Sequence, residues 1–165
     1  MERKEIAVTL HHNNFSCTQS LVAAYANVLG YDPLLSYKMA EGLGLGMGNM
    51  GFCGLIPAMG MIVGAKLSDG DMDNPKTKRR CYNIMTLIQG EFNERVGSMN
   101  CSEIKNNAAD GKGMNCDEIL KMACEILDRH LLGLYDRSEI RIIDNRAKKA
   151  AALAAQAAKE DEEEK

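Results

Sequence analysis

Three of the six cysteines in this chain occupy the same local setting. The segments are 16–19 (SCTQ), 100–103 (NCSE) and 115–118 (NCDE). Each has a capping residue, then Cys, then Glu or Gln three residues after the cap, which is the pattern of a helix N-terminal capping box. The pattern therefore predicts that Cys17, Cys101 and Cys116 each occupy the first position of a helix.

The first turn of a helix offers free backbone N–H groups and the positive end of the helix dipole, both of which favour an anion. We therefore expect these thiols to lose their protons more readily than an ordinary cysteine. The thiolate is the form that attacks disulfides and binds metals. A cysteine is also tolerated at an exposed first turn without any function, but three such positions favour a thiolate site built from helix ends.

Cys53 follows a glycine-rich loop and leads into another predicted helix. Residues 46–51 (GMGNMG) match the spacing G-x-G-x-x-G of dinucleotide sites. Such a site requires a strand before the motif, and the preceding residues have a helical pattern instead. We expect these glycines to allow close backbone approach beside Cys53, and Gly54 to let another backbone or a bulky cofactor come near.

The other candidate residues have simpler interpretations. Cys124 lies on an apolar helical stripe, which predicts a buried, inert thiol, and Cys81 is expected to be half-buried and structural, although the basic residues before it could activate it. His11 and His12 could bind a metal, but capping at a helix C-terminus is favoured, as it is for His130. Because the cysteines form no local cluster, any metal site must be assembled by tertiary folding.

The order of these residues resembles the C_GCAxxG_C_C family, a group of redox-active proteins of prokaryotes. The resemblance extends over about 12–133, and the residues that carry it are Cys17, the glycine loop, Cys53 with Gly54, Cys101 and Cys116.

Within the central motif this chain departs from the family pattern. Leu55 stands where the family has Ala, and Ala58 where it has the second Gly, which affects the packing of the following helix more than the chemistry of Cys53. The resemblance implies redox activity, and relatives that carry this domain are associated with an iron–sulfur centre.

Together, these features favour a redox protein in which four cysteines bind a [2Fe–2S] or [4Fe–4S] cluster for electron transfer. The expected ligands are Cys17, Cys53, Cys101 and Cys116. Two alternatives remain open, a cofactor-free dithiol/disulfide protein and a structural Cys₄ zinc protein. We expect an electron carrier rather than a stand-alone enzyme, with a redox partner that the sequence does not identify and with homodimerisation as a possibility.

The elements that must position these residues are expected to be helices, because few segments alternate apolar and polar residues with period two. The sequence predicts an all-α, single-domain bundle of about six helices with a glycine-rich loop and a C-terminal helical extension. The predicted helices cover residues 2–11, 17–29, 33–42, 53–66, 75–96 and 116–132, with a short helical segment after Cys101.

The global composition fits this interpretation. We expect a helical redox-active domain over 1–135 and an Ala-rich, acidic helical extension over 136–165. The formal net charge is −3, and the chain has no Trp and no basic stripe, so nucleic-acid binding is not expected. The uncharged stretch 42–65 is diluted by glycines and is expected to pack in the protein rather than insert into a membrane. A charged N-terminus and six cysteines favour a cytoplasmic protein.

Overall fold

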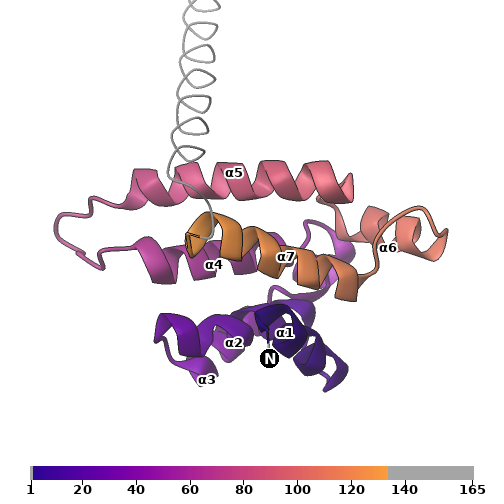
Figure 1. The fold of residues 1–165 in the computed structure, drawn as a ribbon, viewed down its shortest axis with the longest axis horizontal. Coiled ribbons are helices and arrows are strands. Elements are labelled where there is room, and N and C mark those ends of the chain that lie inside the picture. The colour runs from indigo at the N-terminus through magenta and orange to yellow at the C-terminus, as the bar shows by residue number, and fades with distance from the viewer. Residues whose placement is uncertain (1, 134–165) are drawn as a thin grey trace, which may run out of the picture. The chain divides into compact units, whose positions relative to one another are not determined.

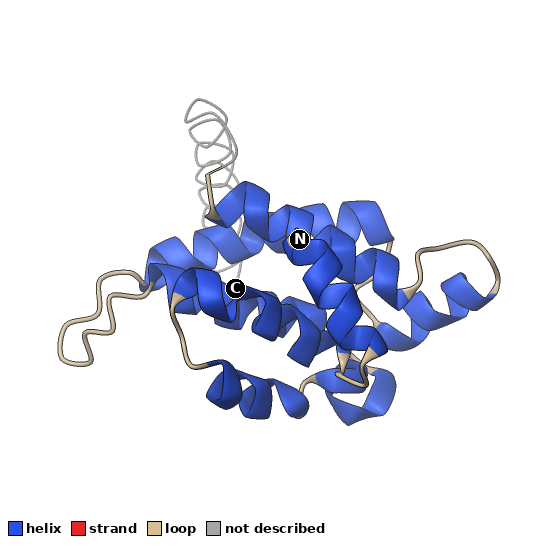
Figure 2. Cartoon of the chain, turned by 60° about the horizontal axis from the view of Figure 1, so that its bottom comes forward, coloured by secondary structure: helices blue, strands red, loops and turns tan. Residues whose placement is uncertain are grey.

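Start and stop residues in the sequence account for most helix boundaries of the protein. The computed structural model describes residues 2–133, and in that range the chain is all-α, as predicted. Helices and loops make up this part of the chain (Figure 2), with one isolated antiparallel bridge between Phe52 and Asn100. The elements are α1 (Arg3–His12), α2 (Cys17–Leu29), α3 (Pro33–Glu41), the π-helical turn η1 (Gly46–Met50), α4 (Leu55–Leu67), α5 (Lys78–Val96), α6 (Cys101–Ala109) and α7 (Cys116–Leu131).

The boundaries of α2 illustrate how local sequence sets a helix. Its first turn is capped by Ser16, whose hydroxyl accepts the N–H of Gln19 at 3.2 Å. Its last turn is closed by Gly30, which has a φ of 71° in the left-handed region. Glycine adopts that conformation without the steric cost that a Cβ would bring. Both boundaries of this helix agree with the prediction.

The helices of the described residues pack in three tiers (Figure 1). Helices α4 and α7 form the middle tier, α5 covers one side of it, and α1, α2 and α3 cover the other. The short helix α6 lies at one end and contacts η1. The N-terminal ends of α4 and α7 lie at this same end, so the topology brings several helix starts together.

The core is built from the apolar stripe of α7 and the helices around it. The five stripe positions that the sequence predicts as core are all buried: Ile119, Met122, Ala123, Ile126 and Leu127. A polar contact connects the outer tier to this core. The hydroxyl of the fully buried Tyr25 lies 2.9 Å from the carbonyl of Cys124 and 2.6 Å from the carboxylate of Asp128.

The structure corrects the predicted start of α5, which begins at Lys78 and not at the Asn74-Pro75 pair. Carboxylates in the preceding loop accept the backbone N–H groups that a helix would otherwise use. Asp71 binds the N–H of Asn74 at 2.9 Å, and Asp69 binds that of Lys76 at 2.9 Å. Local side-chain turns of this kind compete with helix formation. The described part of the chain has seven α-helices, which are the six predicted helices and, as α6, the short helical segment predicted after Cys101.

The predicted domain boundary at residue 135 and the predicted long helix from Ser138 onward lie outside the described residues and stay predictions.

The uncharged stretch 42–65 was expected to pack in the protein rather than insert into a membrane. Within the described part of the chain, no helix has both the length and the hydrophobicity needed to cross a bilayer. The uncharged stretch 42–65 instead contains η1 and most of α4, several of whose side chains are fully buried.

Candidate functional site

Four cysteines from four separate segments of the chain line one small cavity. They are Cys17, Cys53, Cys101 and Cys116, the set that the sequence singles out. The cavity has a volume of about 20 Å³, which is close to the space that a single water molecule needs. All four are free thiols, and Cys53 and Cys101 are buried. Folding therefore assembles a thiol cluster that no local motif contains.

Helix caps position three of these cysteines at the first residue of α2, α6 and α7. The boxes predicted at Ser16 and Asn115 form in full, with the reciprocal Gln19 and Glu118 contacts at 3.0 and 2.8 Å. The third box is only half formed. Asn100 caps α6 through the N–H groups of Ser102 and Glu103.

The missing half of the third box passes through a serine that the sequence analysis overlooked. The N–H of Asn100 donates to the hydroxyl of Ser98 at 3.0 Å, and that hydroxyl donates to Glu103 at 2.6 Å. Because the hydroxyl bridges the two groups, the cap is satisfied without a direct Glu103 contact. The prediction of a complete capping box at Cys101 is therefore wrong in detail, although the helix start is correct.

Cys53 is positioned differently from the other three cysteines. It is not the first residue of a helix, because α4 begins at Leu55. The N–H of Cys53 donates to the carbonyl of Met99 at 2.7 Å, and the N–H of Cys101 donates to the carbonyl of Gly51 at 2.6 Å. These bonds flank the Phe52–Asn100 bridge. They join the segments that carry Cys53 and Cys101, so the relative position of these two residues is set by backbone contacts.

Two glycines make this close assembly possible, as the sequence predicts. A Cβ on Gly54 would lie 2.0 Å from the carbonyl oxygen of Leu43, which is inside any allowed contact distance. A Cβ on Gly46 would lie 2.7 Å from the Cβ of Cys101, and Gly46 also has a φ of 57°. The glycine loop therefore serves close backbone approach around the cysteines and not the binding of a dinucleotide.

The electrostatic environment corrects the expectation of readily ionised thiols. Burial raises the pKa of Cys17 to about 11 and that of Cys53 to about 12, and it also raises the pKa of Cys116. Neighbouring cavity cysteines raise these pKa values further: Cys116 and Cys101 act on Cys17, Cys17, Cys101 and Cys116 act on Cys53, and Cys101 acts on Cys116. Backbone N–H groups at the helix starts do lower the pKa values of Cys17 and Cys53, but desolvation outweighs them.

Three residues around the cavity were missed by the sequence analysis. Lys105 lines it and lowers the pKa of Cys116 electrostatically, against the larger effect of burial. Ile104 and Ile119 also line it and are buried. Helical spacing contained the signal, because each isoleucine follows a helix-start cysteine by three residues and Lys105 follows Cys101 by four.

The remaining cysteines lie elsewhere, as predicted. Cys124 is buried in the core, where desolvation raises its pKa to about 12. Cys81 is half-buried on α5 and packs against the core. Neither lines the cavity.

The histidines lie within hydrogen-bond distance of carboxylates. His11 and His12 lie 2.6 and 2.7 Å from the two carboxylate oxygens of Asp117, the residue after Cys116. His130 lies 2.7 Å from Glu91. The pair His11 and His12 therefore ties the end of α1 to the start of α7, a contact that the sequence analysis did not foresee.

The four thiols match the ligand set of an iron–sulfur cluster or a structural zinc site in type and number. The spatial arrangement of the four thiols, in contrast, is not that of a metal site. Among residues 2–133, no group of three or more His, Cys, Asp or Glu side chains is arranged so that it could hold a metal ion. The donor chemistry therefore fits a metal centre, while the thiols are not placed as ligands around one.

Comparison with known protein families matches residues 15–130 to "Putative redox-active protein (C_GCAxxG_C_C)". The chain belongs to this family. The match includes all four cavity cysteines and spans most of the described residues. No curated protein and no solved structure matches the chain.

Proposed function

We propose that this chain is a redox protein in which Cys17, Cys53, Cys101 and Cys116 bind an iron–sulfur cluster for electron transfer. The observation that carries the proposal is the convergence of four thiols, from four segments, on one cavity. Family membership supports the redox character. The number and type of ligands are those of [2Fe–2S] and [4Fe–4S] centres.

Electrostatics supports a cationic occupant over an empty cavity. Cys17 and Cys53 are buried, and negative charge on the neighbouring cavity cysteines would repel their thiolates, so both thiols hold their protons at neutral pH. The positive charge of iron or zinc offsets that repulsion, and a thiol that coordinates such a metal is deprotonated outright. The raised pKa values therefore favour a metal centre over a pair of free nucleophilic thiols.

The chain's own groups have definite roles in this proposal. The N-terminal amides of α2, α6 and α7 and the ammonium group of Lys105 offset negative charge on the sulfurs. Ile104 and Ile119 exclude water from one part of the cavity, which strengthens those interactions. Such a cluster, when bound, supplies reversible one-electron transfer.

A cofactor-free dithiol protein is the second candidate, and a specific observation favours it. The cavity has room for about one water molecule, and no metal-binding group is formed in the described chain. In this alternative, two cavity thiols undergo thiol–disulfide exchange with a disulfide of a partner protein. A disulfide forms in this chain, the partner's disulfide is reduced to two thiols, and two electrons and two protons pass to the partner. A structural Cys₄ zinc site is the third candidate.

Anaerobic purification with a visible spectrum and with iron, acid-labile sulfide and zinc analysis distinguishes the three candidates. We expect brown protein with near-stoichiometric iron and sulfide. Protein that stays colourless after reconstitution with iron and sulfide overturns the cluster proposal. Stoichiometric zinc then supports the structural site, and a reversible internal disulfide supports the dithiol protein.

Single serine substitutions test the ligand set. We expect Cys17→Ser, Cys53→Ser, Cys101→Ser and Cys116→Ser each to lose or badly weaken the centre, because a hydroxyl poorly replaces a soft thiolate. Cys81→Ser is the matched control, since Cys81 is a half-buried thiol that does not line the cavity. A centre that requires Cys81 but not one of the four would show that the ligand set is wrong.

A further inference from the structure

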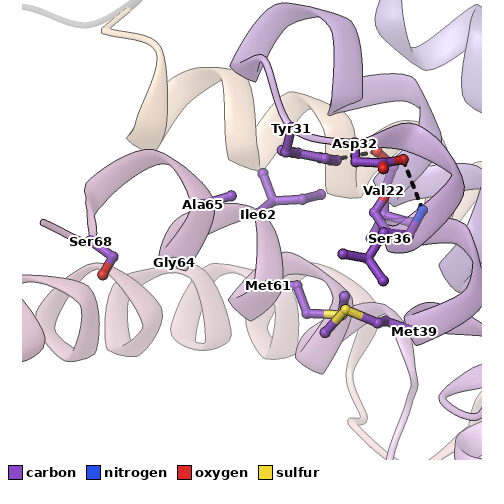
Figure 3. Close-up of a pocket in the computed structure, with 11 residues that line it drawn as sticks. Val22, Tyr31, Asp32, Ser36, Met39, Met61, Ile62, Gly64, Ala65 and Ser68 are labelled. Atoms are coloured by element: carbon purple, nitrogen blue, oxygen red, sulfur yellow. Dashed lines mark hydrogen bonds between the residues drawn. The ribbon is translucent and has the colours of Figure 1, made fainter. Parts of the chain in front are cut away.

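A second and larger cavity opens between α2, α3 and α4 (Figure 3). Its volume is about 420 Å³, which falls in the range of small-molecule sites, about 300–1,000 Å³. Val22 and Ile62 form buried walls, and Met39 and Met61 lie across from each other with flexible, polarisable side chains. It shares no lining residue with the cysteine cavity. We call this second cavity the α3–α4 groove.

Most polar groups along the α3–α4 groove already have a hydrogen-bond partner within the protein. The hydroxyl of Tyr31 donates to the carbonyl of Val22, and the hydroxyl of Ser36 donates to that of Pro33. One carboxylate oxygen of Asp32 accepts the N–H groups of Leu34 and Leu35. Because these groups are occupied, the walls offer mainly apolar contact. An occupant would be held by its hydrocarbon body and not by directed hydrogen bonds.

Gly64 keeps the groove open from the side of α4. A Cβ built on this residue meets nothing within 4 Å, although the residue lies inside a helix and lines the groove. Glycine within a helix costs stability relative to alanine. At the N-cap of α4, Gly54 is required by a backbone contact at 2.0 Å. No such contact accounts for Gly64, and its missing side chain leaves volume in the groove.

Charge narrows the class of occupant. Among the described residues that line the groove, only Asp32 is charged. Its carboxylate disfavours a ligand that carries a carboxylate or phosphate, because like charges repel. We propose that the α3–α4 groove binds a small, uncharged, apolar molecule. The volume of about 420 Å³ is that of a small-molecule site.

Binding of a neutral fluorescent probe, N-phenyl-1-naphthylamine, tests the proposal with full-length protein. We expect a saturable rise in fluorescence with wild type, reversed by 1-decanol. The Cβ of Gly64→Leu meets nothing within 4 Å, and its side chain should occupy part of the groove and weaken probe binding about tenfold or more. Gly90→Leu is the matched control, because Gly90 is a glycine inside α5 whose added Cβ also meets nothing within 4 Å. This control should bind the probe as wild type does.

A competition experiment tests the charge preference. Decanoate should displace the probe about tenfold less effectively than 1-decanol, owing to repulsion by Asp32. Asp32→Asn should reduce that difference while keeping the cap of α3, because Asn also caps helices well. Circular dichroism and thermal melting of each variant verify that the fold is intact.

Several results would overturn the proposal. Equal probe binding by Gly64→Leu and wild type would place the probe elsewhere, and an equal loss in Gly90→Leu would show a nonspecific effect. Absence of saturable binding in wild type would exclude the site for this ligand class. If sedimentation shows a dimer that Gly64→Leu alone disrupts, the groove is a contact between two copies of this chain instead.

Discussion

The cysteine cavity and the α3–α4 groove differ in how their walls are held. The cysteine cavity, about 20 Å³, is closed by contacts in which glycine is a steric requirement, at Gly46 and Gly54. The α3–α4 groove, about 420 Å³, contains a glycine with no neighbour that requires it, Gly64. The difference shows that the same residue type has opposite roles. One set of glycines permits tight assembly, and the other leaves space unfilled.

The contrast extends to the chemistry of the lining. Four thiols line the small cavity, and burial and neighbouring cysteines raise the pKa values of Cys17, Cys53 and Cys116. The large groove is lined by aliphatic and thioether side chains, and most of its polar groups are bound by the protein. A site for chemistry requires fixed groups at short range, whereas a site for an apolar body requires volume and adaptable walls.

The largest expected effect is that of Gly54→Ala. The new methyl group would lie 2.0 Å from the carbonyl oxygen of Leu43 and 2.7 Å from Cγ2 of Thr18, so backbone must shift. We expect a loss of about 3 kcal/mol or more in the free energy of unfolding, because backbone cannot relax as a flexible side chain can. Urea unfolding measures it. A loss below about 1 kcal/mol would show that the cavity walls are no more tightly held than those of the groove.

Much of the fold follows from local signals in the sequence. Ser16 and Gly30 bound α2, and the apolar stripe of α7 is buried as its spacing predicts. Predictions from helix start and capping patterns were wrong where other side chains bound the backbone N–H groups concerned. The carboxylates of Asp69 and Asp71 delay the start of α5, and Ser98 replaces half of the cap at Cys101.

The four cavity cysteines were identifiable because helix caps and glycines mark their neighbourhoods. The raised pKa values of Cys17 and Cys53 were not predictable, since desolvation depends on segments distant in sequence that bury these thiols. The contact of His11 and His12 with Asp117 joins residues more than one hundred positions apart and has no local signature. The α3–α4 groove was also invisible, because its lining residues look like ordinary core and surface residues in the sequence.

A moderate effect is expected for Cys124→Ala, which tests whether thiols outside the cavity matter only for packing. Cys124 is buried in the core and distant from the cavity lining. Removing its sulfur should cost about 1 kcal/mol in unfolding free energy through a small packing defect. Redox behaviour of the protein should be unchanged. A changed reduction potential or cofactor content with normal stability would extend the redox site beyond the cavity.

A smaller effect of opposite sign is expected for Gly64→Ala. The added methyl group enters open space and replaces glycine in a helix interior, so the variant should be more stable by about 0.5–1 kcal/mol. Urea unfolding beside Gly54→Ala measures the contrast directly. Destabilisation by Gly64→Ala would mean that the groove wall is as constrained as the cavity wall, and the proposed difference between the two regions would fail.

The smallest effect is expected for substitution of Asp117, which follows Cys116. We expect its carboxylate to make a pH-dependent contribution to the free energy of unfolding. Hydrogen bonds from His11 and then His12 hold the pKa of Asp117 below its usual range. A carboxyl group with a lowered folded-state pKa contributes stability above its unfolded pKa of about 3.9, and that contribution disappears as the pH falls through the folded value. Because Asp117 is partly exposed, Asp117→Asn should cost less than about 1 kcal/mol at neutral pH.

Denaturant unfolding at pH 7 and at about pH 3 measures this contribution. The difference between wild type and Asp117→Asn should shrink at the lower pH, because the wild-type carboxylate then begins to take up its proton. Asp110→Asn provides the control, since Asp110 is largely exposed and pairs only with Lys112 among the contacts described for it. A deficit for Asp117→Asn that is equal at both pH values would mean that the carboxylate charge is not what ties α1 to the start of α7 beside Cys116.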